Sequence, residues 1–308
     1  MFSVIFPGQG SQIVGMGKEF YTKFDLVKNL FKEADDALNF PLSKIILEGP
    51  KEKLDLTLNT QPAIFLISYS IFQLIKKEFN IDLHRAKFFA GHSLGEYSAI
   101  ACAGYLDFQD TIKILKVRGN AMQNSVPEGE GGMLAVLGTS VENLEKILEN
   151  KKNEFLAEIA NDNSEGQIVL SGKTEDITKI SFFLKENNIK NIKLPVSAPF
   201  HCSLMNKATE IMRLELGKLQ FKKGINPLIS NITADEIFNA DELKDLLVKQ
   251  IENRVRWRES VINMVNKGVN QFIEIGPGKV LSGLIKRINK EVKINTINNE
   301  EDIKNIKI

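Results

Sequence analysis

The residues Gly91-His92-Ser93-Leu94-Gly95 form a G-x-S-x-G motif, the pattern in this 308-residue chain that points most directly to chemistry. A stretch with strand character at 86–90 precedes the motif, and a run with helical character at 96–103 follows it. Strand, tight turn and helix in this order are typical of a nucleophile elbow, which lifts a serine hydroxyl clear of the backbone. Unpaired amides at the start of the helix would favour an oxyanion. The motif predicts Ser93 as a nucleophile, with a serine N-cap at an ordinary turn as the alternative.

A serine nucleophile needs a base to take its proton, and histidine is the usual base. The chain has three histidines. His92 is adjacent to Ser93, so the two side chains should diverge, and His84 lies in a polar segment that predicts a surface position. His201 begins a predicted helix where the chain returns to a predicted cleft, which makes it the candidate base by elimination. A histidine that caps this helix or packs in the core is the alternative.

An acid that orients the histidine is usual in α/β-hydrolase-like proteins, where it lies between serine and histidine in the sequence. Asp162 is one such acid, but it falls within a predicted inserted domain. No acid between Ser93 and His201 is convincing. The sequence therefore favours a Ser93–His201 dyad whose histidine is oriented by a backbone carbonyl.

Arg118 borders an apolar stripe in a predicted helix at 108–123. The stripe has helical spacing and consists of Phe108, Ile112, Leu115, Gly119 and Met122. An arginine in this position needs an anionic partner because a buried lone charge is costly, and a planar guanidinium suits a carboxylate. A substrate carboxylate is one such partner. An internal salt bridge and an arginine that reaches the surface are the alternatives.

Two glycine-rich loops, at 6–12 and 276–279, each follow a predicted strand. Such loops can bring backbone amides to an anion. The first loop does not match G-x-G-x-x-G and the chain has no G-x-x-x-x-G-K-[ST] motif, which disfavours a nucleotide-binding fold. The second loop is best explained as a tight strand–helix turn.

The composition is that of an ordinary globular protein, with 43% hydrophobic and 26% charged residues. A net charge of +1 gives no electrostatic argument for binding nucleic acid. Apolar runs are far shorter than the roughly 20 residues of a membrane span, and the N-terminus predicts a strand rather than a signal peptide. Two cysteines, Cys102 and Cys202, predict neither a disulfide framework nor a metal site. We therefore expect a cytoplasmic protein that binds neither nucleic acid nor membrane.

Short apolar runs alternate with amphipathic segments, which predicts an α/β fold with a mostly parallel sheet. The expected strands lie at 3–6, 87–90, 227–232, 271–275 and 292–297. The expected helices lie at 63–79, 108–123, 203–219, 242–251, 257–266 and 279–288.

The segment 128–196 differs from the rest, because its predicted elements follow the order strand, helix, strand, strand, helix, strand. These elements lie at 133–137, 141–150, 156–160, 167–171, 175–187 and 191–194, with a turn at 161–166. This order is typical of a ferredoxin-like domain. We therefore predict a large α/β-hydrolase-like domain at 1–127 and 197–308, interrupted by a small ferredoxin-like domain at 128–196. A cleft between the two domains is the expected place for a site.

The motifs together resemble the malonyl-CoA:acyl-carrier-protein transacylase family of bacterial fatty-acid synthesis. The matching segments are FPGQGSQ at 6–12, QPA at 61–63, GHSLGEY at 91–97, RG at 118–119, APFH at 198–201, Gln250 with VRW at 255–257, and IGPGKVLSGL at 275–284. They span nearly the whole chain in the family's order. The family's fold also contains an inserted ferredoxin-like domain.

The resemblance implies a role for each matching residue. Ser93 would carry the malonyl group as an ester, and His201 would move the proton. The main-chain carbonyl of Gln250 would hold the second ring nitrogen of His201. The backbone amides of Gln9 and Leu94 would form the oxyanion hole. In the substrate pocket, Arg118 would pair with the malonyl carboxylate, and Phe200 would leave no room for a branched malonyl unit.

The resemblance also implies malonyl-CoA as donor and acyl carrier protein as partner, with no cofactor and no metal. Carrier proteins of this kind are acidic, so Lys286, Arg287 and Lys290 are candidate contacts. Three alternatives stay open at this point. The first is a serine hydrolase such as a thioesterase on the same elbow, the second is an acyltransferase of a polyketide pathway, and the third is a non-catalytic protein that docks the carrier.

Overall fold

The computed structural model describes residues 1–196 and 198–308, and its centre is a six-stranded sheet. The strand order is β10-β9-β1-β2-β7-β8, and all neighbours run parallel except β7 and β8. The strands are β1 (Phe2–Phe6), β2 (Phe89–Gly91), β7 (Leu228–Ile229), β8 (Glu236–Ile237), β9 (Gln271–Ile275) and β10 (Lys293–Ile297).

Strand β1 lies inside this sheet and is buried along its whole length. Successive side chains of a strand point to opposite faces, and accordingly Val4 and Phe6 join one apolar core while Ile5 joins another. This burial on both faces explains the uninterrupted apolar sequence of β1. The register pairs Phe6 with Gly91, so the loops after β1 and β2 leave the sheet side by side. In open α/β sheets this carboxyl edge is where ligands bind.

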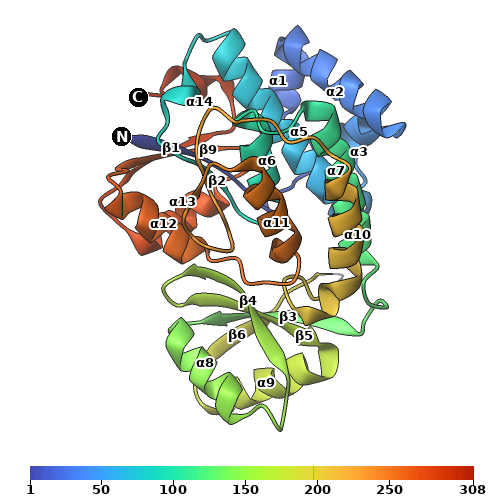
Figure 1. The fold of residues 1–308 in the computed structure, drawn as a ribbon, viewed down its shortest axis with the longest axis vertical. Helices are drawn as coiled ribbons and strands as arrows, with labels where there is room; N and C mark the ends of the chain where they lie inside the picture. Colours follow the sequence, from blue (N-terminus) through green and yellow to red (C-terminus); the bar gives the residue numbers. More distant parts are fainter. Residues whose placement is uncertain (197) are drawn as a thin grey trace.

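Helices pack on both faces of the sheet (Figure 1). The larger core includes side chains of α2 (Asp25–Leu38), α5 (Thr57–Lys77), α6 (Leu94–Cys102), α7 (Phe108–Gln123), α10 (Asn206–Gly217) and α11 (Ala240–Gln250). The core on the other face includes side chains of α12 (Trp257–Asn266) and α13 (Val280–Ile288). Shorter elements are α1 (Lys18–Lys23), α3 (Leu42–Glu48), α4 (Lys51–Asp55), α14 (Glu300–Lys304) and the 3-10 helices η1 (Leu83–Arg85) and η2 (Ser203–Met205).

A second sheet, of four antiparallel strands, lies at one end of the molecule (Figure 1). Its elements are β3 (Gly131–Leu137), α8 (Val141–Asn150), β4 (Ala157–Ser164), β5 (Gln167–Lys173), α9 (Thr174–Glu186) and β6 (Lys190–Lys193). The strand order is β4-β5-β3-β6, and α8 and α9 share a separate apolar core with it. Strand β4 joins this sheet to the rest of the chain, because Asp162 N donates to Val255 O at 2.9 Å and Val255 N to Ala160 O at 2.8 Å.

The predicted α/β class and the mostly parallel sheet are confirmed. The order strand, helix, strand, strand, helix, strand expected for 128–196 is also observed. The domain boundaries at 128 and 196 stay predictions. Ser197, the expected first residue of the second segment of the large domain, lies outside the described residues.

Several predicted elements differ in extent from the structure, and three of the differences have a clear physical reason. The helix expected at 63–79 begins at Thr57, because Pro62 is accommodated inside it rather than near its start. The turn expected at 161–166 is wrong because β4 continues to Ser164 through two bulges. The strand expected at 227–232 ends at Ile229, and the chain then turns so that Asn231 reaches the elbow of Ser93.

Candidate active site

The backbone at Ser93 is strained, and its surroundings hold it in that state. Ser93 lies between β2 and α6 with φ 53° and ψ −111°, values that a residue with a side chain rarely adopts. A Cβ on Gly91 would overlap the backbone of Gly95, and a Cβ on Gly95 would overlap the carbonyl oxygen of Phe6. Asn231 clamps the turn, since Oδ1 accepts from Ser93 N and Nδ2 donates to Gly91 O, each at 2.7 Å. This is the geometry of a nucleophile elbow.

The hydroxyl of Ser93 does not cap α6 but faces His201. Ser93 Oγ lies 2.8 Å from His201 Nε2, and His201 Nδ1 lies 2.8 Å from the backbone oxygen of Gln250. Gln250 ends α11, where carbonyl groups have no partner within the helix. Because a carbonyl only accepts, Nδ1 carries the proton and Nε2 presents a free lone pair to the serine. Ser93, His201 and the Gln250 carbonyl are thus connected by two consecutive hydrogen bonds.

His201 is held in its neutral form. Burial, followed by the positive charge of Arg118, lowers the pKa of His201 to about 3, against the weaker opposing effect of the Gln250 carbonyl. A neutral imidazole is the form that can accept a proton. His201 is therefore available as a base throughout the neutral pH range.

Arg118 reaches the same serine from the other side, and only 1% of its surface is exposed. Nη1 donates to Gln61 Oε1 at 2.8 Å, while Nη2 donates to Gln250 Oε1 at 2.8 Å and to Ser93 Oγ at 3.1 Å. The Tyr97 ring lies 5.4 Å from its guanidinium carbon. Among the described residues Arg118 forms no ion pair, so its hydrogen-bond acceptors are all uncharged. Neither an internal salt bridge nor a surface position describes it, and the guanidinium has no charged partner of its own.

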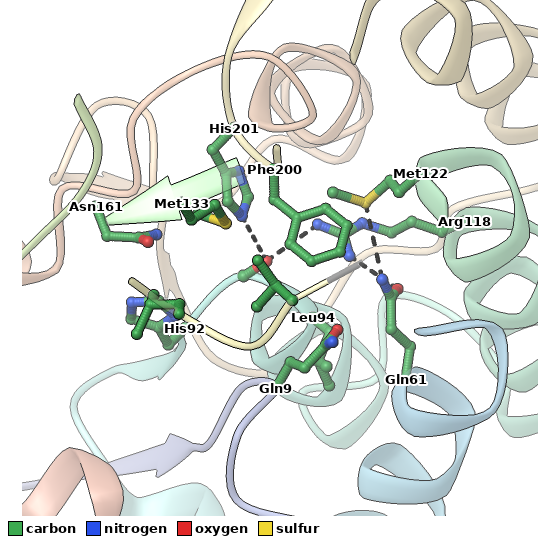
Figure 2. A pocket seen from close by; sticks show the side chains of 13 residues that line it. Gln9, Gln61, His92, Leu94, Arg118, Met122, Met133, Asn161, Phe200 and His201 are labelled. Atoms are coloured by element: carbon green, nitrogen blue, oxygen red, sulfur yellow. Dashed lines mark hydrogen bonds between the residues drawn. The ribbon is translucent and has the colours of Figure 1, made fainter. Parts of the chain in front are cut away.

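These side chains surround a cavity of about 120 Å³. Figure 2 shows His201, Arg118, Gln61 and Phe200 converging on it. The lining residues are Gln9, Gln61, His92, Ser93, Leu94, Arg118, Met122, Met133, Asn161, Leu194, Val196, Phe200 and His201. The space is small compared with the several hundred Å³ of a typical ligand pocket, so it suits a short acyl group. The second sheet contributes to the wall through Met133 of β3 and Asn161 of β4, and the loops after β1 and β2 contribute through Gln9 and His92.

The other residues assigned by resemblance also line this cavity. Leu94 is the first residue of α6, where amides lack partners within the helix, and Gln9 lies in the loop after β1. Phe200, directly before His201, contributes an apolar wall. The structure therefore places Gln9, Leu94 and Phe200 around Ser93, and their roles remain proposals.

Two residues weighed in the sequence lie elsewhere. His84 is partly exposed, as predicted for a surface position, but its ring stacks on Phe89 and lies 2.8 Å from Asn226 Oδ1, away from Ser93. Asp162 is not next to His201, because its carboxylate pairs with Arg258 at 2.9 Å. This leaves the Gln250 carbonyl as the group that orients the base.

The three candidate carrier contacts are exposed on or just after α13. Lys286 Nζ donates to the backbone oxygen of Val292 at 2.7 Å, and Arg287 bonds to Gln167 Oε1 on the second sheet. Lys286 and Arg287 therefore make bonds within the chain. Carrier binding at this place stays a prediction.

Sequence reasoning missed three polar residues that organise the site. Gln61 holds Arg118, Asn231 clamps the elbow, and Glu96 binds Gln250. Gln61 and Glu96 lie inside segments noted for their resemblance, so their position was a usable signal. Asn231 has no local signal, because only the return of β7 to the sheet brings it beside Ser93.

Two kinds of feature are absent from the residues that the structure describes. No helix in that part of the chain has the length and apolar character needed to cross a membrane. Within residues 1–196 and 198–308, no three His, Cys, Asp or Glu side chains are grouped so that they could hold a metal ion.

An elbow serine, a neutral histidine and a buried arginine around a small cavity define an enzyme of the acyl-transfer class. The family model described as the acyl transferase domain matches residues 3–306. The malonyl CoA-acyl carrier protein transacylase of Bacillus subtilis is 43% identical, over 97% of this chain and 94% of that protein. The enzyme of that name from Escherichia coli is 38% identical, over 93% and 92% of the two chains.

Solved structures of malonyltransferases are also similar to this chain in fold. An acyl-carrier-protein S-malonyltransferase from Bartonella henselae superposes with a TM-score of 0.95 at 42% identity, covering 98% of this chain and 97% of that one. A type II PKS acyl-carrier protein in complex with its malonyl-transacylase contains a chain with a TM-score of 0.94 at 35% identity, covering 98% and 97%. The chain therefore belongs to the acyl transferase family and, within it, to the malonyl CoA-acyl carrier protein transacylases.

Proposed function

We propose that this protein transfers a malonyl group from malonyl-CoA to the phosphopantetheine thiol of acyl carrier protein. The observation that carries the proposal is the hydroxyl of Ser93, which lies 2.8 Å from the base His201 and 3.1 Å from the Arg118 guanidinium. A nucleophile beside a buried cation fits an acyl group that ends in a second carboxylate. The product would supply extender units for fatty-acid synthesis.

In the first half-reaction, Ser93 Oγ attacks the thioester carbonyl carbon while His201 Nε2 takes the hydroxyl proton. The amides of Gln9 and Leu94 donate to the carbonyl oxygen as it becomes negative. The bond from carbon to sulfur then breaks, and His201 returns the proton to the departing CoA thiol. The malonyl group remains on Ser93 as an ester, with its free carboxylate on Arg118.

The second half-reaction is the reverse of the first, with another thiol. His201 takes the proton of the carrier's phosphopantetheine thiol, and the sulfur attacks the ester carbonyl. Ser93 leaves as an alkoxide and recovers its proton from His201. The apolar side chains of Met122, Met133 and Leu194 around the ester help to keep water from the acyl group.

The wall at Phe200 supports a preference for malonyl over branched units. The cavity of about 120 Å³ has little space beyond a short acyl group. A methyl branch on the malonyl carbon would have to displace the ring or neighbouring apolar side chains, at a cost in packing.

The reaction as proposed uses residues of the chain alone, without cofactor or metal. We also propose that the large α/β part is hydrolase-like and that residues 128–196 form an inserted ferredoxin-like domain, which the strand order β4-β5-β3-β6 supports. A cytoplasmic location is also proposed, because the free cysteines Cys102 and Cys202 are compatible with a reducing compartment.

The test is a transfer assay with malonyl-CoA and holo acyl carrier protein, in which malonyl-carrier is measured by mass spectrometry. We expect carrier loading and, before carrier is added, a malonyl adduct on Ser93. Ser93→Ala should give neither product while keeping the fold. Release of free malonate without loading of the carrier would instead identify a hydrolase and overturn the proposal.

A further inference from the structure

A buried carboxylate lies behind the site and takes no part in the steps above. Glu96, in the first turn of α6, is 1% exposed. Its Oε2 accepts from Gln250 Nε2 at 2.6 Å and from the backbone amide of Asn231 at 3.3 Å. Its Oε1 has no partner among the described residues. A carboxylate buried at this cost calls for a reason beyond packing.

Gln250 connects Glu96 to the chemistry with separate groups. Its backbone oxygen holds His201, while its side-chain Oε1 accepts from Arg118 Nη2 at 2.8 Å. Its Nε2 donates both to Glu96 and to the backbone oxygen of Ser93, the latter at 3.1 Å. Removal of the side-chain amide would therefore affect Arg118 and leave the carbonyl of the base in place.

The orientation of the Gln250 amide matters because its two ends have nearly the same size but opposite hydrogen-bonding character. In the observed orientation the oxygen faces a donor, Arg118, and the nitrogen faces an acceptor, Glu96. If the amide were turned over, its nitrogen would face the guanidinium and its oxygen would face the carboxylate. Glu96, with the shorter of the two bonds from Nε2, and the backbone oxygen of Ser93 therefore both favour the orientation that lets Gln250 hold Arg118.

We propose that Glu96 is a positioning residue that acts through the Gln250 amide on Arg118, and thereby sets the preference of Ser93 for acyl groups with a free carboxylate. The inference rests on the proposed transfer of malonyl groups. It differs from a general structural role, because it predicts an effect on malonyl transfer that acetyl transfer does not share.

The test compares acylation of Ser93 by malonyl-CoA and acetyl-CoA in Glu96→Leu and Glu96→Gln. Leucine removes the acceptor, so we expect malonyl acylation to fall at least tenfold and acetyl acylation less than threefold. Glutamine keeps an acceptor oxygen and should retain the malonyl-to-acetyl ratio within threefold of the parent chain. An equal loss for both acyl groups in Glu96→Leu would overturn the proposal.

Glu274→Leu is the matched control. Glu274 is also fully buried, but its oxygens accept from the amides of Leu281 and Ser282 at the start of α13, with no bond to Arg118 or Gln250. Its loss should lower stability and leave the malonyl-to-acetyl ratio unchanged. A ratio that falls in this control as it does in Glu96→Leu would show that any buried carboxylate has the effect, which would refute the specific link.

Gln250→Met tests the second half of the link, from the amide to Arg118, and it can refute the proposal even if Glu96→Leu does not fold. The backbone carbonyl that holds His201 is kept, so the malonyl-to-acetyl ratio should fall while acetyl acylation persists. An unchanged ratio in Gln250→Met would overturn the proposal. If the parent chain itself transfers no malonyl group, the proposed function fails, and that result is read before any variant is compared.

Discussion

The hydroxyl of Ser93 is the point where two demands on the site meet. In the proposed reaction it gives its proton to His201, and it also lies beside Arg118, the cation proposed to bind the substrate carboxylate. In the free protein Arg118 donates to the hydroxyl oxygen, which leaves the hydroxyl hydrogen for Nε2 of His201. Both bonds can therefore exist at once.

Replacement of Arg118 should discriminate between acyl groups. In Arg118→Ala we expect malonyl acylation of Ser93 to fall roughly a hundredfold, about 3 kcal/mol, because a charge-assisted bidentate contact is lost. Acetyl acylation should change far less, since acetyl has no second carboxylate. Rapid-quench mass spectrometry of the acyl-enzyme measures both rates. Arg118→Lys keeps the positive charge but not the planar bidentate guanidinium, so its rate of malonyl acylation should lie between those of the parent chain and Arg118→Ala. Equal losses for malonyl and acetyl acylation in Arg118→Ala would refute the role of Arg118 in binding the carboxylate.

The lowered pKa of His201 predicts an unusual pH profile. An ordinary histidine base loses activity below about pH 6.5, but burial and Arg118 bring the pKa of His201 to about 3. Labelling of Ser93 by an uncharged sulfonyl fluoride should therefore show no break near pH 6.5. A break near pH 7 that disappears in Glu96→Gln would belong to Glu96, whose pKa burial raises to about 7. A break at 6.5 that persists in that variant would contradict a desolvated His201.

The elbow, as an element, depends on the close approach of α6 to β1. In Gly95→Ala the new methyl group would overlap the Phe6 carbonyl. We therefore expect the free energy of unfolding to fall by about 2 kcal/mol or more and the acylation of Ser93 to be lost. Gly283→Ala is the matched control in a helix, because nothing lies within 4 Å of its added Cβ and the site is exposed. The free energy of unfolding of Gly283→Ala should rise by up to about 1 kcal/mol, because alanine favours a helix more than glycine does. Urea unfolding measures both, and similar values for the two variants would contradict the steric argument.

Helices with strong local periodicity were predictable, and those shaped by their neighbours were not. The helices at 108–123 and 257–266 have the predicted bounds, because an apolar stripe coincides with clear ends. Helix α2 was not among the expected helices, although it has a similar stripe that makes it predictable on the same grounds, formed by Val27, Leu30, Phe31 and Ala34. Helices α3 and α4 are too short for periodicity to define, and their packing against α5 decides them.

The same contrast holds for the site. Ser93 and Arg118 were predictable because a local motif or stripe marks them, and His201 because the chain has few histidines. The Gln250 amide, Asn231 and the partner of Asp162 depend on contacts between distant segments. Asp162 stood as a possible acid for His201 until the structure paired it with Arg258, 96 positions away.

On the scale of the molecule, the cavity depends on how the two sheets are held together. Asp162 of β4 is 1% exposed and pairs with Arg258 of α12, while Asn163 Oδ1 lies 2.8 Å from His92 Nε2 beside the nucleophile. This contact region fixes Met133 and Asn161, which the second sheet contributes to the cavity wall. A shift of the sheet would therefore open the acyl pocket.

Arg258→Met should test this connection, because it leaves the Asp162 carboxylate buried without its partner. We expect a loss of about 3–5 kcal/mol in the free energy of unfolding and a rise in hydrolysis of the acyl-enzyme, with partial recovery when Asp162→Asn is added. The pair Arg256–Glu259 lies within one helix end and is more exposed, so Glu259→Gln should cost less than about 1 kcal/mol. Equal losses in Arg258→Met and Glu259→Gln would show that the buried pair does not hold the sheets.

The free energy of unfolding of the whole chain should depend on pH through the ionisation of Glu96. Burial raises the pKa of Glu96 from 4.5 to about 7 in the folded chain, against the smaller opposing effects of Gln250, Asn231 and Arg118. Below pH 4.5 both the folded and unfolded states hold the proton, and Glu96 costs nothing. Between pH 4.5 and 7 only the unfolded state releases it, so the contribution of Glu96 to stability falls as pH rises, and above pH 7 the cost is constant.

Glu96→Gln has no proton to release, so its stability relative to the parent chain should rise between pH 4.5 and 7. The expected gain is about 3 kcal/mol in the free energy of unfolding, from the difference of about 2.5 in pKa. Urea unfolding of both chains at pH 4.5, 6 and 7.5 measures it, and the difference cancels every other group that titrates in this range. A constant difference across the three values would contradict the raised pKa, because it would mean that Glu96 binds its proton equally in the folded and unfolded chains.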